Sequence, residues 1–184
     1  MKTSEVDILI LPGLTGGTPQ HWYARWNDRL ETARRVDPAD PHAPDRAEWT
    51  KKLVDAVAAA RRPVVLVAHS LGTAVAVHAT KETGLPGVAG AFLVAVPDVE
   101  RTENMPAEVA GFAPLPRNPL PFPSMVVASR TDVWCDYERV EDFAASWGSL
   151  LIDAGDAGHL NDESGHGPWP EGLTRFAMLM KRIG

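Results

Sequence analysis

Cysteine is almost absent from this sequence, since Cys135 is the only one among 184 residues. A single cysteine excludes an internal disulfide framework and any zinc site built from several cysteines. The lone thiol has two interpretations. We favour a buried, inert side chain, and a redox-sensitive thiol near a functional site is the alternative.

Positive charge and long apolar runs are also scarce. Lys and Arg number 18 against 24 Asp and Glu, so the net charge is −6. This balance argues against nucleic acid and anionic membranes as partners. No apolar run approaches the ~20 residues of a membrane-spanning helix, and residues 1–7 contain no apolar signal segment. We therefore expect a soluble, cytoplasmic protein.

The composition is that of one ordinary globular domain, with 45% hydrophobic residues and no repeat or linker. We expect a single domain over residues 1–184. Apolar runs typical of strands alternate with segments of helical periodicity. The expected strands are 6–11, 33–36, 64–68, 88–96, 125–128 and 150–152. The expected helices are 19–31, 45–60, 73–83, 136–147 and one that begins at Pro168. This alternation predicts an α/β fold with a mainly parallel sheet of about six strands and helices on both faces.

The segment 64–83 contains the first candidate for chemistry. The apolar run Val64–Ala68 is followed at once by His69, Ser70 and a helix-forming stretch. A serine in a tight turn between strand and helix is the arrangement of a nucleophile elbow. The N–H of Leu71 would then lie at a helix N-terminus, where it can stabilise an oxyanion. The alternative is an ordinary turn, because Ala68 departs from the usual glycine.

A nucleophilic serine needs a base and an acid that orients this base. In α/β-hydrolases both follow the serine in the chain, first the acid and then the histidine. Asp132 and Asp98 each follow an expected strand. We favour Asp132, because a short loop leads from its strand into a helix. The alternative for either residue is a solvated loop acid or a helix cap.

Six histidines are present. Four are unsuitable as the base because they precede the serine, adjoin it or lie in an apolar helix: His21, His42, His69 and His78. We expect His69 to point away from the serine oxygen and His78 to have a packing role. His159 lies in a turn after the last expected strand, at the same sheet edge as Ser70, and is favoured over His166 in a Gly-His-Gly loop.

The glycine-rich loop 12–17 follows the first expected strand. The N–H of Leu14 is therefore expected to be the second oxyanion donor beside that of Leu71. A phosphate-binding role for this loop is disfavoured, because it lacks both a P-loop and a dinucleotide-binding pattern. The loop segment 159–166 contains acids and histidines without the HExxH spacing of a helical zinc site. We expect no metal and no cofactor.

The substrate pocket is expected beside Ser70. Its candidate residues are Gly13, Thr15, His21, Trp22, His69 and Trp134, with Phe112 as a further apolar wall. For Trp22, a place in the helix core is the favoured alternative. Residues 97–123 contain seven prolines, and we expect this segment to cover the site, because long irregular segments in compact domains are usually functional or disordered.

Several motifs resemble those of one known family. They are Leu11-Pro12-Gly13 with His21-Trp22, then 67–72, then Ser129–Asp132 with Trp134-Cys135, and, most distinctive, 155–165 with 169–172. The sequence is similar over nearly its whole length to the small serine hydrolases of the retinoblastoma-binding protein nine and YdeN-like family. This resemblance implies a minimal α/β-hydrolase without a large cap domain, and a triad of Ser70, Asp132 and His159.

Two departures from the family limit what the resemblance implies. Val133 stands where the family commonly has proline after the aspartate. The Leu-x-Cys-x-Glu string associated with retinoblastoma binding is absent. Val133 stands two positions before Cys135 in place of leucine, and Tyr137 stands two positions after it in place of glutamate. We therefore expect no such protein partner.

The sequence thus favours a metal-free serine hydrolase that acts on a small-molecule acyl substrate, either an ester, a thioester or an amide. A non-catalytic binding protein that keeps the hydrolase fold is the alternative. A flavin or nucleotide binder is disfavoured by the missing fingerprint. The oligomeric state is not indicated.

Overall fold

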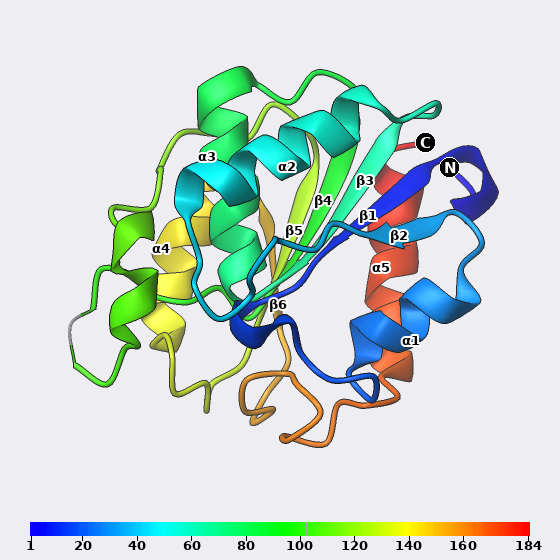
Figure 1. The fold of residues 1–184 in the computed structure, drawn as a ribbon. Helices are drawn as coiled ribbons and strands as arrows, with labels where there is room; N and C mark the ends of the chain where they lie inside the picture. Colours follow the sequence, from blue (N-terminus) through cyan, green and yellow to red (C-terminus); the bar gives the residue numbers. More distant parts are fainter. Residues whose placement is uncertain (102) are drawn as a thin grey trace.

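The computed structural model of the protein describes residues 1–101 and 103–184. Its centre is one parallel sheet of six strands in the order β2-β1-β3-β4-β5-β6 (Figure 1). The strands are β1 (Asp7–Leu11), β2 (Ala33–Arg35), β3 (Val64–His69), β4 (Val88–Val94), β5 (Ser124–Ala128) and β6 (Leu150–Asp153). The α/β fold and the number of strands predicted from the sequence are confirmed.

The strands differ in burial, and the most apolar strands are the most buried. All residues of β1, β3 and β5 are buried, whereas β2 and β6 at the two edges are mostly half-buried. Parallel strands covered on both faces are nearly continuous apolar runs, and β3 with its three valines is such a run. The expected strand 33–36 is therefore an edge strand of the sheet.

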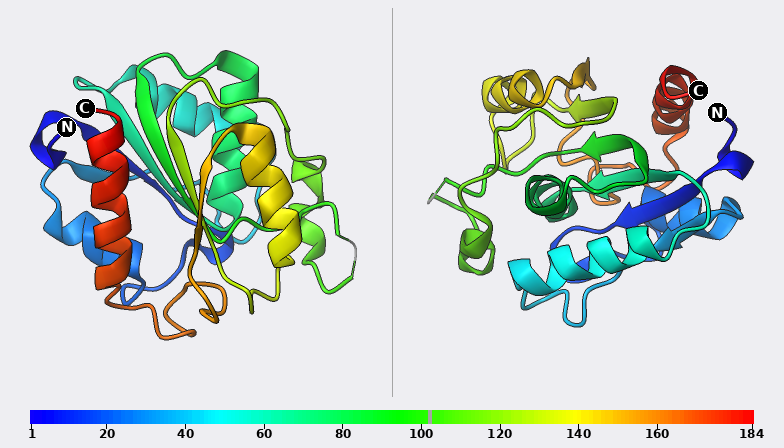
Figure 2. Two further views of the ribbon diagram at one scale, coloured as in Figure 1. Left: turned by 180° about the vertical axis from the view of Figure 1, so that it is seen from behind. Right: turned by 90° about the horizontal axis from the view of Figure 1, so that it is seen from above.

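Helices cover both faces of the sheet (Figure 2). One face packs against α2 (Arg46–Ala58), α3 (Leu71–Thr83) and α4 (Tyr137–Trp147), and the other against α1 (Trp22–Arg29) and α5 (Pro170–Arg182). Each face therefore has its own hydrophobic core. The segment between β4 and β5 contains a short 3-10 helix, η3 (Ala107–Phe112), which packs on the first face.

Two helices begin later than their prolines indicate. The helix expected from residue 19 begins at Trp22, because residues 19–20 form a turn that the N–H of His21 closes onto the Thr18 carbonyl. The last helix begins at Pro170 instead of Pro168. In contrast, α2 begins where the sequence predicts, because Asp45 caps it: the Asp45 carboxylate accepts a 2.7 Å hydrogen bond from the N–H of Glu48.

The register of the sheet determines which loops meet. Leu11 at the end of β1 is paired with Ala68 near the end of β3, and His69 is paired with Val94 of β4. The loop after β1, the turn after β3 and the loops after β5 and β6 therefore converge at the carboxyl edge of the sheet. Within the described residues, no helix has the length and apolar character needed to cross a membrane.

Candidate active site

Ser70 occupies a strained turn between β3 and α3. Its φ and ψ are 52° and −126°, and its N–H donates a 3.0 Å hydrogen bond to the Val94 carbonyl. A positive φ at a residue other than glycine is costly and is common at functional sites. Gly72 permits this turn, because a Cβ there would lie 2.4 Å from the Leu11 carbonyl oxygen. Alanine fits at position 68 in place of the usual glycine, because its methyl group is fully buried in the core.

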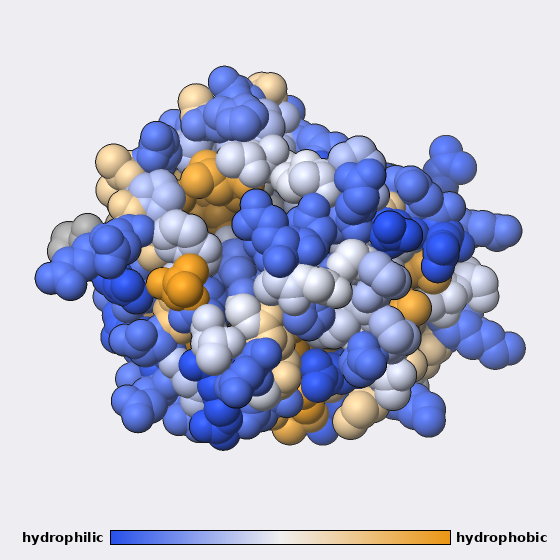
Figure 3. All heavy atoms as spheres, turned by 90° about the horizontal axis from the view of Figure 1, so that it is seen from below, coloured by the Kyte–Doolittle hydropathy of each residue, from blue (hydrophilic) through white to orange (hydrophobic). Residues whose placement is uncertain are grey.

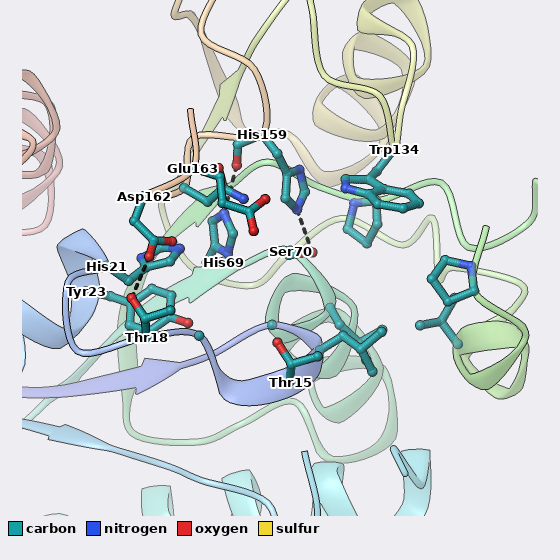
Figure 4. Close-up of a pocket in the computed structure, with 18 of the residues that line it drawn as sticks. Thr15, Thr18, His21, Tyr23, His69, Ser70, Trp134, His159, Asp162 and Glu163 are labelled. Carbon is teal, nitrogen blue, oxygen red and sulfur yellow. Dashed lines mark hydrogen bonds between the residues drawn. The ribbon is translucent and has the colours of Figure 1, made fainter. Parts of the chain in front are cut away.

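His159 contacts both the serine and an acid. Its Nε2 lies 2.9 Å from Ser70 Oγ, and its Nδ1 lies 2.9 Å from each carboxylate oxygen of Asp132 (Figure 4 shows the contact with Ser70). A carboxylate only accepts hydrogen bonds, so Nδ1 carries the proton and Nε2 of the neutral ring accepts the serine hydroxyl. The Asp132 carboxylate also accepts a 3.0 Å hydrogen bond from the Trp134 N–H.

The rejected alternatives have other partners. The Asp98 carboxylate forms a 3.3 Å ion pair with Arg139 on α4. His166 Nδ1 lies 3.2 Å from the hydroxyl of Ser164. His78, expected to have a packing role, lies 2.8 Å from the Phe112 carbonyl through its Nε2. Of the candidate acids and bases, Asp132 and His159 are therefore the pair that the fold brings to Ser70.

Hydroxyl groups after β5 hold the loop of His159. Ser129 Oγ accepts a 2.9 Å hydrogen bond from the Ala157 N–H, and Thr131 Oγ1 accepts one of 3.0 Å from the Gly158 N–H. The residues that lead to Asp132 thus also fix the segment that leads to His159. Sequence reasoning missed this link. The sequence does contain a signal for this link, because Ser129 and Thr131 carry hydroxyl groups and lie just before Asp132.

Two backbone N–H groups are available beside Ser70. Leu71 is the first residue of α3, and Leu14 is the first of the 3-10 helix η2 (Leu14–Gly16), so neither N–H has an acceptor within its own helix. Both residues border the same cavity. The loop approaches Ser70 closely at Gly13, where an added Cβ would lie 2.9 Å from the Ser70 Cβ. This arrangement is suited to holding a negatively charged oxygen.

A cavity of about 320 Å³ adjoins Ser70. Around Ser70, Trp134 lies on one side, and Thr18, His21, Asp162 and Glu163 lie on the other (Figure 4). Viewed from the carboxyl edge of the sheet, the surface is largely hydrophilic, with hydrophobic side chains gathered around a hollow on one side (Figure 3). The site therefore combines an apolar part with a polar part.

Five of the expected pocket residues line this cavity: Gly13, Thr15, His21, His69 and Trp134. The other expectation, Trp22, is wrong as a pocket residue, because its ring is fully buried in the core and its indole N–H donates a 2.8 Å hydrogen bond to the Leu160 carbonyl. Phe112 is likewise a core residue, packed edge-on against Trp49.

Only part of the expected roof borders the cavity. Pro97, Met105, Pro106 and Val109 line it. Farther along, residues such as Leu115 pack into the core on the face of α3 and α4. Residue 102, which falls within this predicted roof, lies outside the described residues. A lid function for the segment stays a prediction.

Burial controls the charge of several groups near the site. Desolvation lowers the pKa of His21 to about 3 and outweighs the opposing effect of Asp162, so this ring is neutral. Burial also lowers the pKa of His69. It raises the pKa of the Cys135 thiol, which is therefore protonated at neutral pH. The thiol is thus a poor nucleophile, consistent with the inert state favoured from the sequence.

The chain is similar to known proteins in both sequence and structure. The sequence matches the family model for serine hydrolases over residues 8–178. A structure described as a YdeN-like hydrolase from Pectobacterium atrosepticum has 29% identity and a TM-score of 0.88, and the match covers 98% of this chain and 94% of that one. No curated protein matches significantly.

More distant structures share the fold. The ydeN gene product of Bacillus subtilis has 18% identity and a TM-score of 0.72, with 95% of this chain and 98% of that one covered. Est1E from Butyrivibrio proteoclasticus, solved with ferulic acid, has 15% identity and a TM-score of 0.72, with 97% and 90% covered. The chain therefore belongs to the serine hydrolase family, and it is similar in sequence and fold to a YdeN-like hydrolase of the α/β-hydrolase type.

Proposed function

We propose that this protein is a metal-independent hydrolase that cleaves a small carboxylic ester, thioester or amide through an acyl-enzyme on Ser70. The observation that carries the proposal is the continuous series of 2.9 Å contacts from Ser70 Oγ through His159 to Asp132. The esterases among the structural neighbours support the reaction class.

In the first half of the reaction, Ser70 Oγ attacks the carbonyl carbon while His159 Nε2 takes its proton. The negative charge that forms on the carbonyl oxygen is held by the N–H groups of Leu14 and Leu71. Asp132 keeps the ring in the correct tautomer and stabilises its protonated form. The leaving group then departs with the proton from His159, and the acyl group stays bound to Ser70.

In the second half, a water molecule takes the place of the leaving group. His159 removes a proton from this water as its oxygen attacks the acyl carbon, and the proton then returns to Ser70 Oγ. The acid is released and the serine is regenerated. The cavity of about 320 Å³ is at the small end of ligand pockets, which span ~300–1,000 Å³, and this size favours small substrates.

Labelling with a fluorophosphonate tests the proposal. Wild-type protein should be labelled on Ser70, and Ser70→Ala should lose the label. Ser146→Ala is the matched control, because this serine lies on α4 and its hydroxyl bonds the Asp142 carbonyl. Equal labelling of Ser70→Ala and wild type would overturn the proposal.

Turnover separates the enzyme from a binding protein that has kept the fold. With p-nitrophenyl acetate, wild type should greatly exceed His159→Ala in rate. Equal rates for the two proteins would favour the non-catalytic alternative.

A further inference from the structure

The polar side of the cavity is negatively charged. Asp162 and Glu163 both line it, and no Lys or Arg does so among the described residues. The Asp162 carboxylate accepts a 2.5 Å hydrogen bond from the Thr18 hydroxyl, which fixes it between the loops after β1 and β6. Neither carboxylate takes part in an ion pair within the described part of the chain. These negative charges therefore face the cavity without an ion-pair partner among the described residues.

His21 provides a second, independent observation. Its side chain is 2% exposed, and neither ring nitrogen has a hydrogen-bond partner among the described residues. The ring is stacked on Tyr23 at 3.7 Å and meets His69 edge-on at 4.6 Å between centroids. Buried polar atoms are nearly always hydrogen-bonded, so an unpartnered imidazole that borders a cavity points to a bound group that completes it.

The charge state of these groups selects the kind of ligand. A neutral imidazole offers one acceptor nitrogen, and the carboxylates only accept. Figure 4 shows His21 beside Asp162 and Thr18, with the Glu163 side chain directed toward the middle of the cavity. A group that carries positive charge and N–H donors complements all three, whereas a carboxylate or phosphate would be repelled.

We propose that the polar side of the cavity, formed by His21, Asp162 and Glu163, is a subsite for a protonated amine. Preferred substrates are then acyl compounds that carry an ammonium group a few bonds from the scissile carbonyl. This inference rests on the proposed hydrolase function and names its substrate class. The competing explanation is that the carboxylates are merely solvated surface groups.

Isosteric esters test the charge preference directly. One set contains the p-nitrophenyl esters of γ-dimethylaminobutanoic acid, its uncharged isostere δ-methylhexanoic acid, glutaramic acid and glutaric acid. These acyl groups are positive, apolar, polar but neutral, and negative at neutral pH. A second pair places the amine in the leaving group, as dimethylaminoethyl acetate against isopentyl acetate. Ser70→Ala supplies the background rate for each ester.

We expect kcat/KM for the amine to exceed that for its apolar isostere by about tenfold in at least one of the two pairs. The glutaric ester should be the slowest of its set, and added salt should reduce the preference because it screens the charges. A ratio of one or less in both pairs would overturn this inference and leave the hydrolase proposal standing, as would a glutaramic ester that matches the amine. Absence of turnover with every ester would overturn both.

Variants locate the preference. Glu163→Gln and Asp162→Asn should each bring the ratio of the two kcat/KM values closer to one. Glu163 is exposed, so its variant should fold even where loss of the Thr18 bond disturbs Asp162→Asn. Glu31→Gln is the matched control, because this exposed acid precedes β2 at the opposite edge of the sheet. An unchanged ratio in Glu163→Gln and Asp162→Asn would overturn the subsite.

Discussion

His69 Nε2 donates a 2.9 Å hydrogen bond to the main-chain carbonyl of His159. Burial lowers the pKa of His69 and keeps its ring neutral, and a carbonyl only accepts, so this nitrogen carries the proton. His69, which precedes Ser70, therefore holds the backbone of His159, and the His159 ring contacts the Ser70 hydroxyl. The partner of the His69 ring is thus the His159 carbonyl, and His69 acts on the site through this bond.

Replacement of His69 by leucine should lower kcat more than it raises KM. The variant leaves the carbonyl of His159 unpaired and its ring less well positioned, so we expect a loss on the order of tenfold to a hundredfold. His69→Gln, whose amide can donate, should recover part of the rate. Steady-state kinetics with p-nitrophenyl acetate measure the effect. Wild-type kcat in the leucine variant would show that the bond is dispensable.

Asp132→Asn should reduce kcat by about 10³–10⁴, because an amide no longer fixes the tautomer of His159. Asp98→Asn is the matched control, since its carboxylate pairs with Arg139 instead. We expect its kcat to stay near that of wild type. If Asp98→Asn lost more activity than Asp132→Asn, the assignment of the acid would have to be reversed.

Three glycines should respond differently to alanine. In Gly13→Ala the new Cβ would lie 2.9 Å from the Ser70 Cβ, so activity should fall. In Gly72→Ala it would meet the Leu11 carbonyl oxygen at 2.4 Å, so the free energy of unfolding should fall by about 1–3 kcal/mol. Gly111→Ala meets nothing within 4 Å and serves as the control. Urea denaturation and kinetics together separate these outcomes, and wild-type stability in Gly72→Ala would contradict the tight contact.

His21 should make the protein less stable in acid. Its pKa is lowered by burial to about 3 in the folded state, against ~6.5 when unfolded. The unfolded chain therefore binds the proton first as the pH falls below ~6.5, and stability declines by up to ~1.36 kcal/mol per pH unit for this group. The loss continues down to the folded pKa and is absent above the unfolded one.

Urea unfolding between about pH 7 and pH 4 measures this decline. His21→Leu should show a shallower dependence of the free energy of unfolding on pH than wild type. His42→Leu is the control, because it makes the same substitution at an exposed histidine. A slope in His21→Leu as steep as that of wild type would exclude this histidine as the cause.

Much of the fold could be predicted because the strands are apolar runs with clear ends. The order of Ser70, Asp132 and His159 along the chain also indicated which groups would meet at the carboxyl edge. These inferences depend on local pattern and on the general rule that strand ends carry the active groups.

The orientation of individual rings could not be predicted in the same way. His21 and Trp22 are neighbours and both were expected in the pocket, yet only His21 lines it. The start of α1 at Trp22 decides this, because it turns the indole toward the Leu160 carbonyl in the core. Neither ring nitrogen of His21 has a partner among the described residues, and the groups packed around this ring include residues distant in the sequence, such as His69. No local pattern in the sequence indicates these surroundings.

The position of β6 affects how the protein could lose activity. This edge strand has four residues, none of them fully buried, and His159 follows it. Ser70, in contrast, follows the central strand β3, whose residues are all buried. Edge segments open locally at lower free energy than central ones. We therefore expect heat inactivation to precede global unfolding. His159 would move away from the site while Ser70 stays in its turn.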